Sequence, residues 1–314
     1  MLHLLKKGEK IMNKSDWLLA RKKGLGSTDA APVLGMSRWG NPLTVYLDKI
    51  GESPEREDNE TMEWGRRLES VVADAFAEKN NCKLYHSGEI SYHKDYPFLL
   101  ANVDRVIDDG KSLLECKTAN QYKTDEWEDG KIPIEYQLQV MHQLAVTGLQ
   151  TGHIACLIGG QKYVQAKIER DEAMIDMIVT REVEFWNEFV VKRQPPFIDG
   201  SKASTEILKL LYPTVESFEQ IQIPDSFNDL IDKRKELQFQ SDTIDFEIDQ
   251  IENQLKQALK SNESGLTNKY IVSWKECKMN RLNTELLKRE QKAMFDAYTQ
   301  LSSYRRFNIK EIKS

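Results

Sequence analysis

Two carboxylates and a lysine lie close together in the first half of the chain. Asp104 is followed eleven residues later by Glu115, and Lys117 stands two positions beyond Glu115. Two carboxylates without a histidine or cysteine ligand beside them favour a hard cation such as Mg²⁺ or Mn²⁺. A metal that polarises a phosphoryl oxygen, next to an ammonium group that orients the attacking water, is the minimum for a metal-dependent phosphodiesterase.

The two acids fall in strand-like runs at residues 98–107 and 112–119, which are separated by the hairpin signal Asp108-Asp109-Gly110. Acids on the two strands of an antiparallel hairpin can meet on one face of a sheet. Because side chains alternate along a strand, Glu115 and Lys117 share a face and the residue between them points to the other.

The same spacing also fits a solvated surface turn, so the neighbouring elements matter. Glu69, in the helical segment before the strands, either adds a third carboxylate or is a surface glutamate. In the helical segment 132–148, Tyr136, Gln139 and His142 recur at intervals of three and share one stripe. That stripe either faces the acids or is an ordinary polar helix face.

The distribution of charge leaves a DNA ligand open. The 314 residues have a formal net charge of −6, which by itself argues against nucleic acid, but residues 1–40 carry a net +5, and so do residues 263–314. Because a phosphate backbone responds to the local field in a groove, an acidic protein with basic segments can still bind DNA. Solvated faces with a chance separation of charge are the alternative.

Composition is that of a soluble globular protein. The mean hydropathy is −0.58, and no apolar run approaches the roughly 20 residues of a membrane helix. Residues 1–14 lack the order of a secretory signal, and the four cysteines lack the spacing of a zinc site or a disulfide framework. We therefore expect a cytoplasmic protein with reduced thiols and no membrane partner.

The predicted elements follow the order helix, three strands, helix, two strands, which indicates an α/β fold with one central sheet. An amphipathic helix at residues 171–193 follows, and the composition shifts near Pro224. From there, apolar residues at helical spacing predict one or two long helices up to Leu259, with a narrow seam that packs on the front of the chain or on a partner. We place the domains at residues 1–200 and 201–314.

Several ordered motifs resemble a known family. The segment RKKGLGSTDAAPVLGMSRWGNPLTVYLDKIGE, followed by WGRRLE, LLANVDRVI, LLECKTA and YQLQVMHQLAVTG, resembles the YqaJ-type viral recombinases. These are similar to phage lambda exonuclease within the PD-(D/E)XK nuclease superfamily. The resemblance spans roughly residues 15–200 and implies a restriction-endonuclease-like core, with a central mixed sheet flanked by helices, and a helical C-terminal extension.

The resemblance also assigns roles at the metal. It implies that Asp104 and Glu115 ligate Mg²⁺, with Mn²⁺ as a substitute, and that the backbone carbonyl of Cys116 is a further ligand. It implies that Lys117 positions the nucleophilic water. The remaining catalytic candidates by resemblance are Glu69 and Gln139.

A second group of candidates concerns DNA. Arg21 and Thr28 match an arginine and a hydroxyl residue that grip the 5′-phosphate of the degraded strand in the lambda-type enzymes. A guanidinium fork beside a hydroxyl at a helix start suits a phosphate, whereas surface charge and helix capping are the alternative interpretation. Trp39 either stacks on a base or is a core aromatic. The further candidates for DNA contact are Ser27, Tyr136 and His142.

The chain departs from the family pattern at three places near these residues. Gly26-Ser27-Thr28-Asp29 stands where the family usually has Gly-Gly-Ser-Asp, and Asn102-Val103 precedes Asp104 where the superfamily's name has a proline. Gln139-Val140-Met141 holds one of the two glutamines expected before His142. None of these changes removes a proposed metal ligand.

Together the motifs predict a Mg²⁺-dependent exonuclease of phage-type recombination, which degrades the 5′ strand of linear duplex DNA and leaves a 3′ single-stranded overhang. The resemblance implies duplex DNA ends as substrate, a single-strand annealing protein as partner, and a ring-shaped, trimeric homo-oligomer encoded by a phage or prophage. An endonuclease or nickase on the same scaffold, and a non-catalytic DNA-binding adaptor, are the alternatives.

Overall fold

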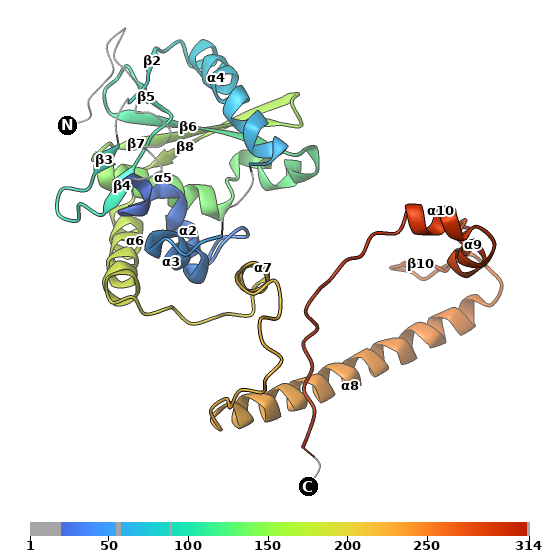
Figure 1. The fold of residues 1–314 in the computed structure, drawn as a ribbon. Coiled ribbons are helices and arrows are strands. Elements are labelled where there is room, and N and C mark those ends of the chain that lie inside the picture. The colour runs from blue at the N-terminus through green and yellow to red at the C-terminus, as the bar shows by residue number, and fades with distance from the viewer. Residues whose placement is uncertain (1–19, 55–57, 88–89, 313–314) are drawn as a thin grey trace. The chain divides into compact units, whose positions relative to one another are not determined.

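The computed structural model describes residues 20–54, 58–87 and 90–312 (Figure 1). The prediction about a secretory signal concerns residues outside these ranges. By its internal contacts the chain divides into two compact units. Unit 1 ends at Pro213, and unit 2 begins at Thr214.

A five-stranded sheet forms the centre of unit 1, in the order β2-β5-β6-β7-β8. Strands β6 and β7 are parallel, whereas the other neighbouring pairs are antiparallel, so the sheet is mixed. The strands are β2 (Leu84–Tyr85), β5 (Arg105–Ile107), β6 (Ser112–Ala119), β7 (Thr151–Ile158) and β8 (Lys162–Glu169).

The strand predicted at residues 98–107 is divided between this sheet and a smaller one with the order β1-β4-β3. Its first part, β4, pairs with β1 and β3, and its second part, β5, pairs with β2 and β6. Asp104 therefore stands where the chain passes from one sheet to the other. The strands of the smaller sheet are β1 (Leu25–Gly26), β3 (Ser91–Tyr92) and β4 (Leu99–Ala101).

Helices cover both faces of the five-stranded sheet, with α4 on one face and α5 and α6 on the other (Figure 1). Alternation along β6 sends Leu114 into a buried cluster with Phe76 of α4, and Leu113 into a separate cluster with Leu138 of α5. The prediction of a central mixed sheet flanked by helices is confirmed. The helices are α2 (Ala30–Val33), α3 (Pro42–Ile50), α4 (Glu60–Asn80), α5 (Ile134–Thr147), α6 (Glu172–Phe185) and α7 (Lys202–Leu211).

Short helical turns complete unit 1. A 3₁₀ turn, η1, precedes α2, two more follow β6, and a π-helical turn extends α6. Helix α7 packs on unit 1 beyond the predicted domain boundary at residue 200, because Ile207 is buried in a cluster with Leu25 and Phe185. The turns are η1 (Ser27–Asp29), η2 (Gln121–Glu126), η3 (Glu128–Gly130) and η4 (Trp186–Val191).

One glycine fixes the distance between α5 and the sheet. A Cβ atom at Gly152 of β7 would lie 2.2 Å from Cγ1 of Val140, so only a hydrogen fits beneath the helix. Helix α5 ends at Gly148, whose φ of 73° is in the left-handed region that glycine adopts without strain. The close packing brings the polar stripe of α5 down to β6.

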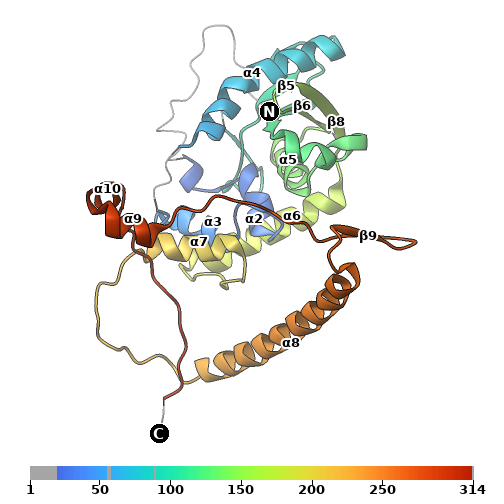
Figure 2. The same ribbon diagram turned by 90° about the vertical axis from the view of Figure 1, so that its right-hand side faces the viewer.

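Unit 2 contains one long helix, α8, which Figure 2 shows along most of its length. Leu230, Leu237, Ile244 and Ile251 recur on it at intervals of seven, and each is about half exposed or more. The predicted apolar seam is therefore present on α8, and the residues of unit 2 that the structure describes do not cover it. Throughout the part of the chain that the structure describes, no helix is long and apolar enough to cross a membrane. The elements are α8 (Phe227–Leu259), β9 (Ser264–Leu266), β10 (Ile271–Ser273), α9 (Thr284–Glu290) and α10 (Lys292–Ala297).

Candidate active site

The two predicted acids lie side by side. In the antiparallel register of β5 and β6, Arg105 stands opposite Leu114, which places Asp104 opposite Glu115 at the end of the ladder. Asp104 Oδ2 accepts a hydrogen bond from the backbone N–H of Cys116 at 2.8 Å. The hairpin between the strands thus brings the two carboxyl groups together, as the spacing predicts.

Three side chains hold the carboxylate of Glu115. Its Oε1 accepts hydrogen bonds from Lys117 Nζ and from Gln139 Nε2, both at 2.6 Å. Its Oε2 accepts one from Gln143 Nε2 at 2.7 Å. Glu115 is 4% exposed, so these charge-assisted bonds replace water and fix the orientation of both oxygens.

Burial and like charges act on Asp104. Desolvation, followed by the charges of Glu115 and Glu69, raises the pKa of Asp104 well above its usual value. Burial alone would lower the pKa of Lys117, but Glu115 and Asp104 outweigh it and raise that pKa, so Lys117 is an ammonium group. A buried carboxylate beside a half-buried one that repels it makes a site whose electrostatics improve when a cation binds.

The donor set fits a hard divalent cation held by two carboxylates. Glu69 is engaged elsewhere, since its Oε1 accepts a hydrogen bond from Arg105 Nη1 at 2.7 Å. Among the residues that the structure describes, no group of three or more His, Cys, Asp or Glu residues is arranged to hold a metal. Mg²⁺ is commonly bound by one or two carboxylates and keeps several waters, so Asp104 and Glu115 are sufficient protein ligands for it.

The thiol of Cys116 does not share a face with Glu115. Desolvation, with the neighbouring charge of Asp104, raises the pKa of the Cys116 thiol, which is therefore protonated and a poor metal ligand. Its side chain packs against the cluster of Phe76 and Leu114, on the face away from Glu115. The role of its carbonyl oxygen as a ligand stays a prediction.

The predicted phosphate pair lies at the same place. Arg21 Nη2 donates a hydrogen bond to Thr28 Oγ1 at 3.0 Å. A cavity of about 190 Å³ is lined by these two residues and by both acids. Motifs separated by some eighty residues of sequence thus share one concave site. Its lining includes Arg21, Ser27, Thr28, Asn102, Asp104, Glu115, Lys117 and Gln139.

A buried ion pair supports the turn that carries Thr28. Asp29 Oδ2 accepts from the backbone N–H of Gly26 at 2.8 Å and lies 2.7 Å from Lys49 Nζ. Burial would raise the pKa of Asp29, but Lys49 and Arg21 outweigh burial and lower it. Lys49 was not singled out from the sequence, because the pair joins η1 to α3 and no local motif marks Lys49.

Tyr136 connects the acids to a row of aromatic rings. Lys117 Nζ lies 5.0 Å from the centre of the Tyr136 ring, a cation–π distance. The ring also contacts Trp39 and Trp127, with centroids 5.7 and 5.5 Å away. Desolvation raises the pKa of Tyr136, so its hydroxyl is protonated. Trp39 is 55% exposed, which rules out the alternative that it is a core aromatic.

The prediction that His142 contacts DNA is wrong in its geometry, because His142 is 1% exposed and faces away from the acids. Its Nδ1 lies 2.8 Å from Glu182 Oε1, and its Nε2 donates to the carbonyl oxygen of Leu100 at 2.8 Å. The Leu100 carbonyl is an acceptor, and so is Glu182 when ionised, so the pair is satisfied when both ring nitrogens carry protons. Burial would lower the pKa of His142, but Glu182 outweighs it and raises that pKa.

Gln143 is the site residue that the sequence analysis missed. It is fully buried, and besides Glu115 it contacts the carbonyl oxygen of Asn102 at 3.3 Å. The signal was available, because Gln143 follows Gln139 by four residues and therefore lies on the same helix face. Met141, which replaces the expected second glutamine, is buried in the core.

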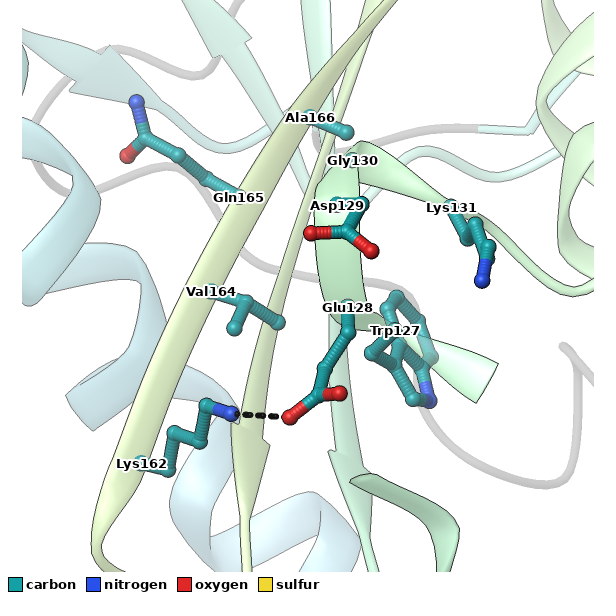
Figure 3. A pocket seen from close by; sticks show the side chains of 9 residues that line it. All are labelled: Trp127, Glu128, Asp129, Gly130, Lys131, Lys162, Val164, Gln165 and Ala166. Carbon is teal, nitrogen blue, oxygen red and sulfur yellow. Dashed lines mark hydrogen bonds and ion pairs between the residues drawn. The ribbon is translucent and has the colours of Figure 1, made fainter. Parts of the chain in front are cut away.

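A wider cavity of about 530 Å³ lies away from these residues, between η3 and the edge strand β8 (Figure 3). In its lining, Lys162 Nζ of β8 lies 3.0 Å from Glu128 Oε1. It contains neither of the paired acids nor the phosphate pair, so its size does not make it the candidate active site.

Solved structures identify the class of fold. The structure is similar to the alkaline exonuclease of Laribacter hongkongensis, with a TM-score of 0.50 and 22% sequence identity over 57% of this chain and 94% of that chain. The same enzyme in complex with dAMP gives a TM-score of 0.51 over the same shares. The chain therefore contains the fold of an exonuclease.

Sequence relatives identify the family. A model of the YqaJ-like viral recombinase domain matches residues 16–150. The uncharacterised protein YqaJ of Bacillus subtilis strain 168 is 38% identical over 304 residues, which cover 96% of this chain and 95% of that protein. The chain belongs to the YqaJ family of viral recombinases, as its motifs predict.

Proposed function

We propose that this protein is a Mg²⁺-dependent exonuclease of phage-type recombination, acting in the bacterial cytoplasm. It hydrolyses the 5′ strand of linear duplex DNA and leaves a 3′ single-stranded overhang. The observation that carries the proposal is the shared cavity, which is lined by the pair Arg21 and Thr28 and by the acids Asp104 and Glu115. A site that holds both a terminal phosphate and a scissile phosphate cleaves at a fixed distance from an end.

The residues of the site have different roles in phosphodiester hydrolysis. Asp104 and Glu115 would hold a divalent cation, which when bound would supply Lewis acidity for phosphodiester hydrolysis. Lys117, which lies 2.6 Å from Glu115, donates a hydrogen bond that orients the attacking water. Gln139 fixes the Glu115 oxygen that Lys117 also contacts, so the acid and the ammonium group keep their mutual geometry.

The other side of the cavity selects the end. Arg21 can give two parallel N–H donors to a phosphate, and the Thr28 hydroxyl adds a third donor beside them. A phosphate held there places the first internucleotide phosphate toward Asp104. We propose that Ser27 and Tyr136 line the path of the same strand, since Ser27 borders the cavity and Tyr136 packs over Lys117.

Digestion of matched DNA ends tests the proposal. Linear duplex with 5′-phosphate, linear duplex with 5′-hydroxyl, and closed circular DNA are incubated with Mg²⁺ or with EDTA. We expect mononucleotides from linear DNA in Mg²⁺ only, released more slowly from 5′-hydroxyl ends, and none with Asp104→Asn. Cleavage of the circle, or release from the 3′ end, contradicts the proposed polarity.

Partner proteins belong to the proposal as well. We propose that the protein forms a homo-oligomer, a trimeric ring by resemblance, and works with a single-strand annealing protein. The exposed apolar seam of α8 supports an interaction surface in unit 2. Light scattering on the full-length protein measures the oligomer directly, and a monomer at micromolar concentration contradicts the ring.

A further inference from the structure

A second cavity adjoins the cavity that the paired acids line. It has a volume of about 430 Å³, and Arg21 and Thr28 line it as well as the cavity of the acids. The hydrogen-bonded pair is therefore the wall between two cavities of unit 1. The volume lies within the range of about 300–1,000 Å³ that is typical of small-molecule sites.

The second cavity has the side chains that a nucleoside requires. Trp39 lines it with an indole that is 55% exposed. The backbone N–H of Trp39 donates to Ser37 Oγ at 3.1 Å, and the preceding Arg38 is held by Glu126 at 2.8 Å and by Glu135 at 2.6 Å. The ring is thus presented from an anchored loop, as a stacking platform for a base must be.

The charges around the cavity favour the DNA backbone. Its two acids, Asp29 and Asp48, lie 2.7 and 3.1 Å from the buried Lys49 ammonium group, which offsets part of their charge. Arg21 and the exposed Lys22 also line the cavity, so two cations and two carboxylates border it, and both carboxylates are paired with the buried Lys49. A site of this kind accepts a nucleoside joined to a phosphate.

We propose that the second cavity binds the terminal nucleoside of a DNA strand that lacks a 5′-phosphate, with its base against Trp39. This inference rests on the proposed exonuclease function. When the terminal nucleoside enters the cavity, the first internucleotide phosphate takes the position between Arg21 and Thr28 that a 5′-phosphate otherwise fills. The strand is then shifted by one nucleotide relative to the acids.

The shifted strand has a different first product. Water attacks the phosphorus between the second and third nucleotides, and the bond from that phosphorus to the O3′ atom breaks. The O3′ atom leaves on the second nucleotide and takes up a proton, while the third nucleotide keeps a 5′-phosphate. The first product from a 5′-hydroxyl end is a dinucleotide with two free hydroxyl ends, and every later product is a mononucleotide.

The first experiment identifies that product on the full-length protein with Mg²⁺. A duplex with 5′-hydroxyl ends and labelled nucleosides is digested briefly, and the products are separated. We expect a dinucleotide first from the 5′-hydroxyl duplex and mononucleotides only from its 5′-phosphorylated twin. A nucleoside as first product from the 5′-hydroxyl duplex overturns the proposal, because the strand is then not shifted.

The second experiment measures binding in EDTA and needs no hydrolysis. The probes are duplexes with a single-nucleotide 5′-hydroxyl overhang that carries either a base or an abasic sugar. Because stacking on an aromatic side chain is worth about 1–3 kcal/mol per base, the base should strengthen binding at least about fivefold. We expect Trp39→Ala to abolish this difference and Trp39→Phe to retain most of it.

Trp274 of unit 2 provides the matched control, because it is 52% exposed and lies outside the cavity. Trp274→Ala should leave the effect of the overhanging base unchanged. Equal binding of the two probes by the wild-type protein, or equal loss in both tryptophan variants, overturns the proposal. If the base effect depends on Trp39 but digestion shows another polarity, the cavity assignment stands and the proposed function fails.

Discussion

Gln143 Nε2 lies 2.7 Å from Glu115 Oε2, the oxygen that Lys117 and Gln139 leave free. The same amide group contacts the carbonyl oxygen of Asn102, in the segment that leads to Asp104. Gln143 thereby joins the two strands that carry the acids, from a helix that packs on the sheet. It is a positioning residue for the acid pair, through Glu115.

Replacing Gln143 should weaken metal binding. Gln143→Leu preserves the volume in the core but removes the donor to Glu115, so the carboxylate loses its fixed orientation. Loss of a side chain that orients a metal ligand typically lowers metal affinity or activity by about 10- to 100-fold. Calorimetric titration of the protein with Mn²⁺, without DNA, measures the change independently of hydrolysis.

Gln137 is the matched control on the same helix. Its Nε2 donates to the carbonyl oxygen of Ile132 at 2.6 Å and does not contact either acid. Gln137→Leu should keep the wild-type affinity for Mn²⁺. Equal affinities in the Gln137 and Gln143 variants would show that Gln143 does not act on the metal site.

Removing the charge of Asp104 should stabilise the metal-free protein. Burial, together with Glu115 and Glu69, raises the pKa of Asp104 in the folded state, so folding binds a proton there. The pKa of this carboxyl group in the unfolded chain is 3.8, and its pKa in the folded protein is higher. As pH rises above 3.8 and through the folded pKa, the group therefore favours folding less. Asp104→Asn can still accept from the N–H of Cys116 but carries no charge.

Calorimetry in EDTA tests this effect. At neutral pH, Asp104→Asn should raise Tm by about 2 °C or more, while digestion of linear DNA in Mg²⁺ is lost. The difference in Tm should disappear at acidic pH, where the wild-type carboxyl group is protonated as well. A lower Tm in EDTA at neutral pH would mean that the acids do not repel one another.

The pair of His142 and Glu182 should affect the free energy of unfolding rather than the hydrolysis of DNA. Both side chains are almost fully buried, so His142→Ala leaves a carboxylate without its partner. Breaking a buried pair in this way destabilises by about 3–5 kcal/mol. Urea unfolding measures the loss, and the double variant His142→Leu with Glu182→Leu should be more stable than His142→Ala, because no unpaired charge remains.

This pair also gives stability a pH dependence with a defined sign. The pKa of His142 is raised in the folded protein, so its contribution is fully present below the unfolded value of 6.5 and is lost as pH rises through the folded pKa. The difference in unfolding free energy between the wild type and the double variant should therefore shrink on going from about pH 6 to about pH 9. A difference that grows over this range contradicts a protonated His142.

The acid pair could be predicted from sequence because its geometry is local. A hairpin signal between two strand-like runs fixes the register, and alternation then places Glu115 and Lys117 on one face. The division of residues 98–107 between two sheets could not be predicted, because both halves have the same strand-like composition. Which sheet each half joins depends on distant strands, since β4 pairs with β1 and β5 pairs with β2.

The polar residues of α5 show that a repeated spacing of three residues does not keep side chains on one helix face. Residues three apart are rotated by about −60° around a helix, so His142 is turned by about 120° from Tyr136. Residues four apart differ by about 40°, which keeps Gln143 beside Gln139. The sequence therefore indicated the correct helix, but it predicted the core residue His142 as a site residue and missed Gln143.

The seam of α8 should carry the self-association of the protein. Leu237 and Ile244 lie one heptad apart and are 52% and 56% exposed, and burying such side chains is the main driving force for helix pairing. Ile244→Lys should lower the molar mass measured by light scattering, whereas Phe239→Lys, at an exposed position off the seam, should not. If the seam instead packs on unit 1, Ile244→Lys lowers Tm and leaves the molar mass unchanged.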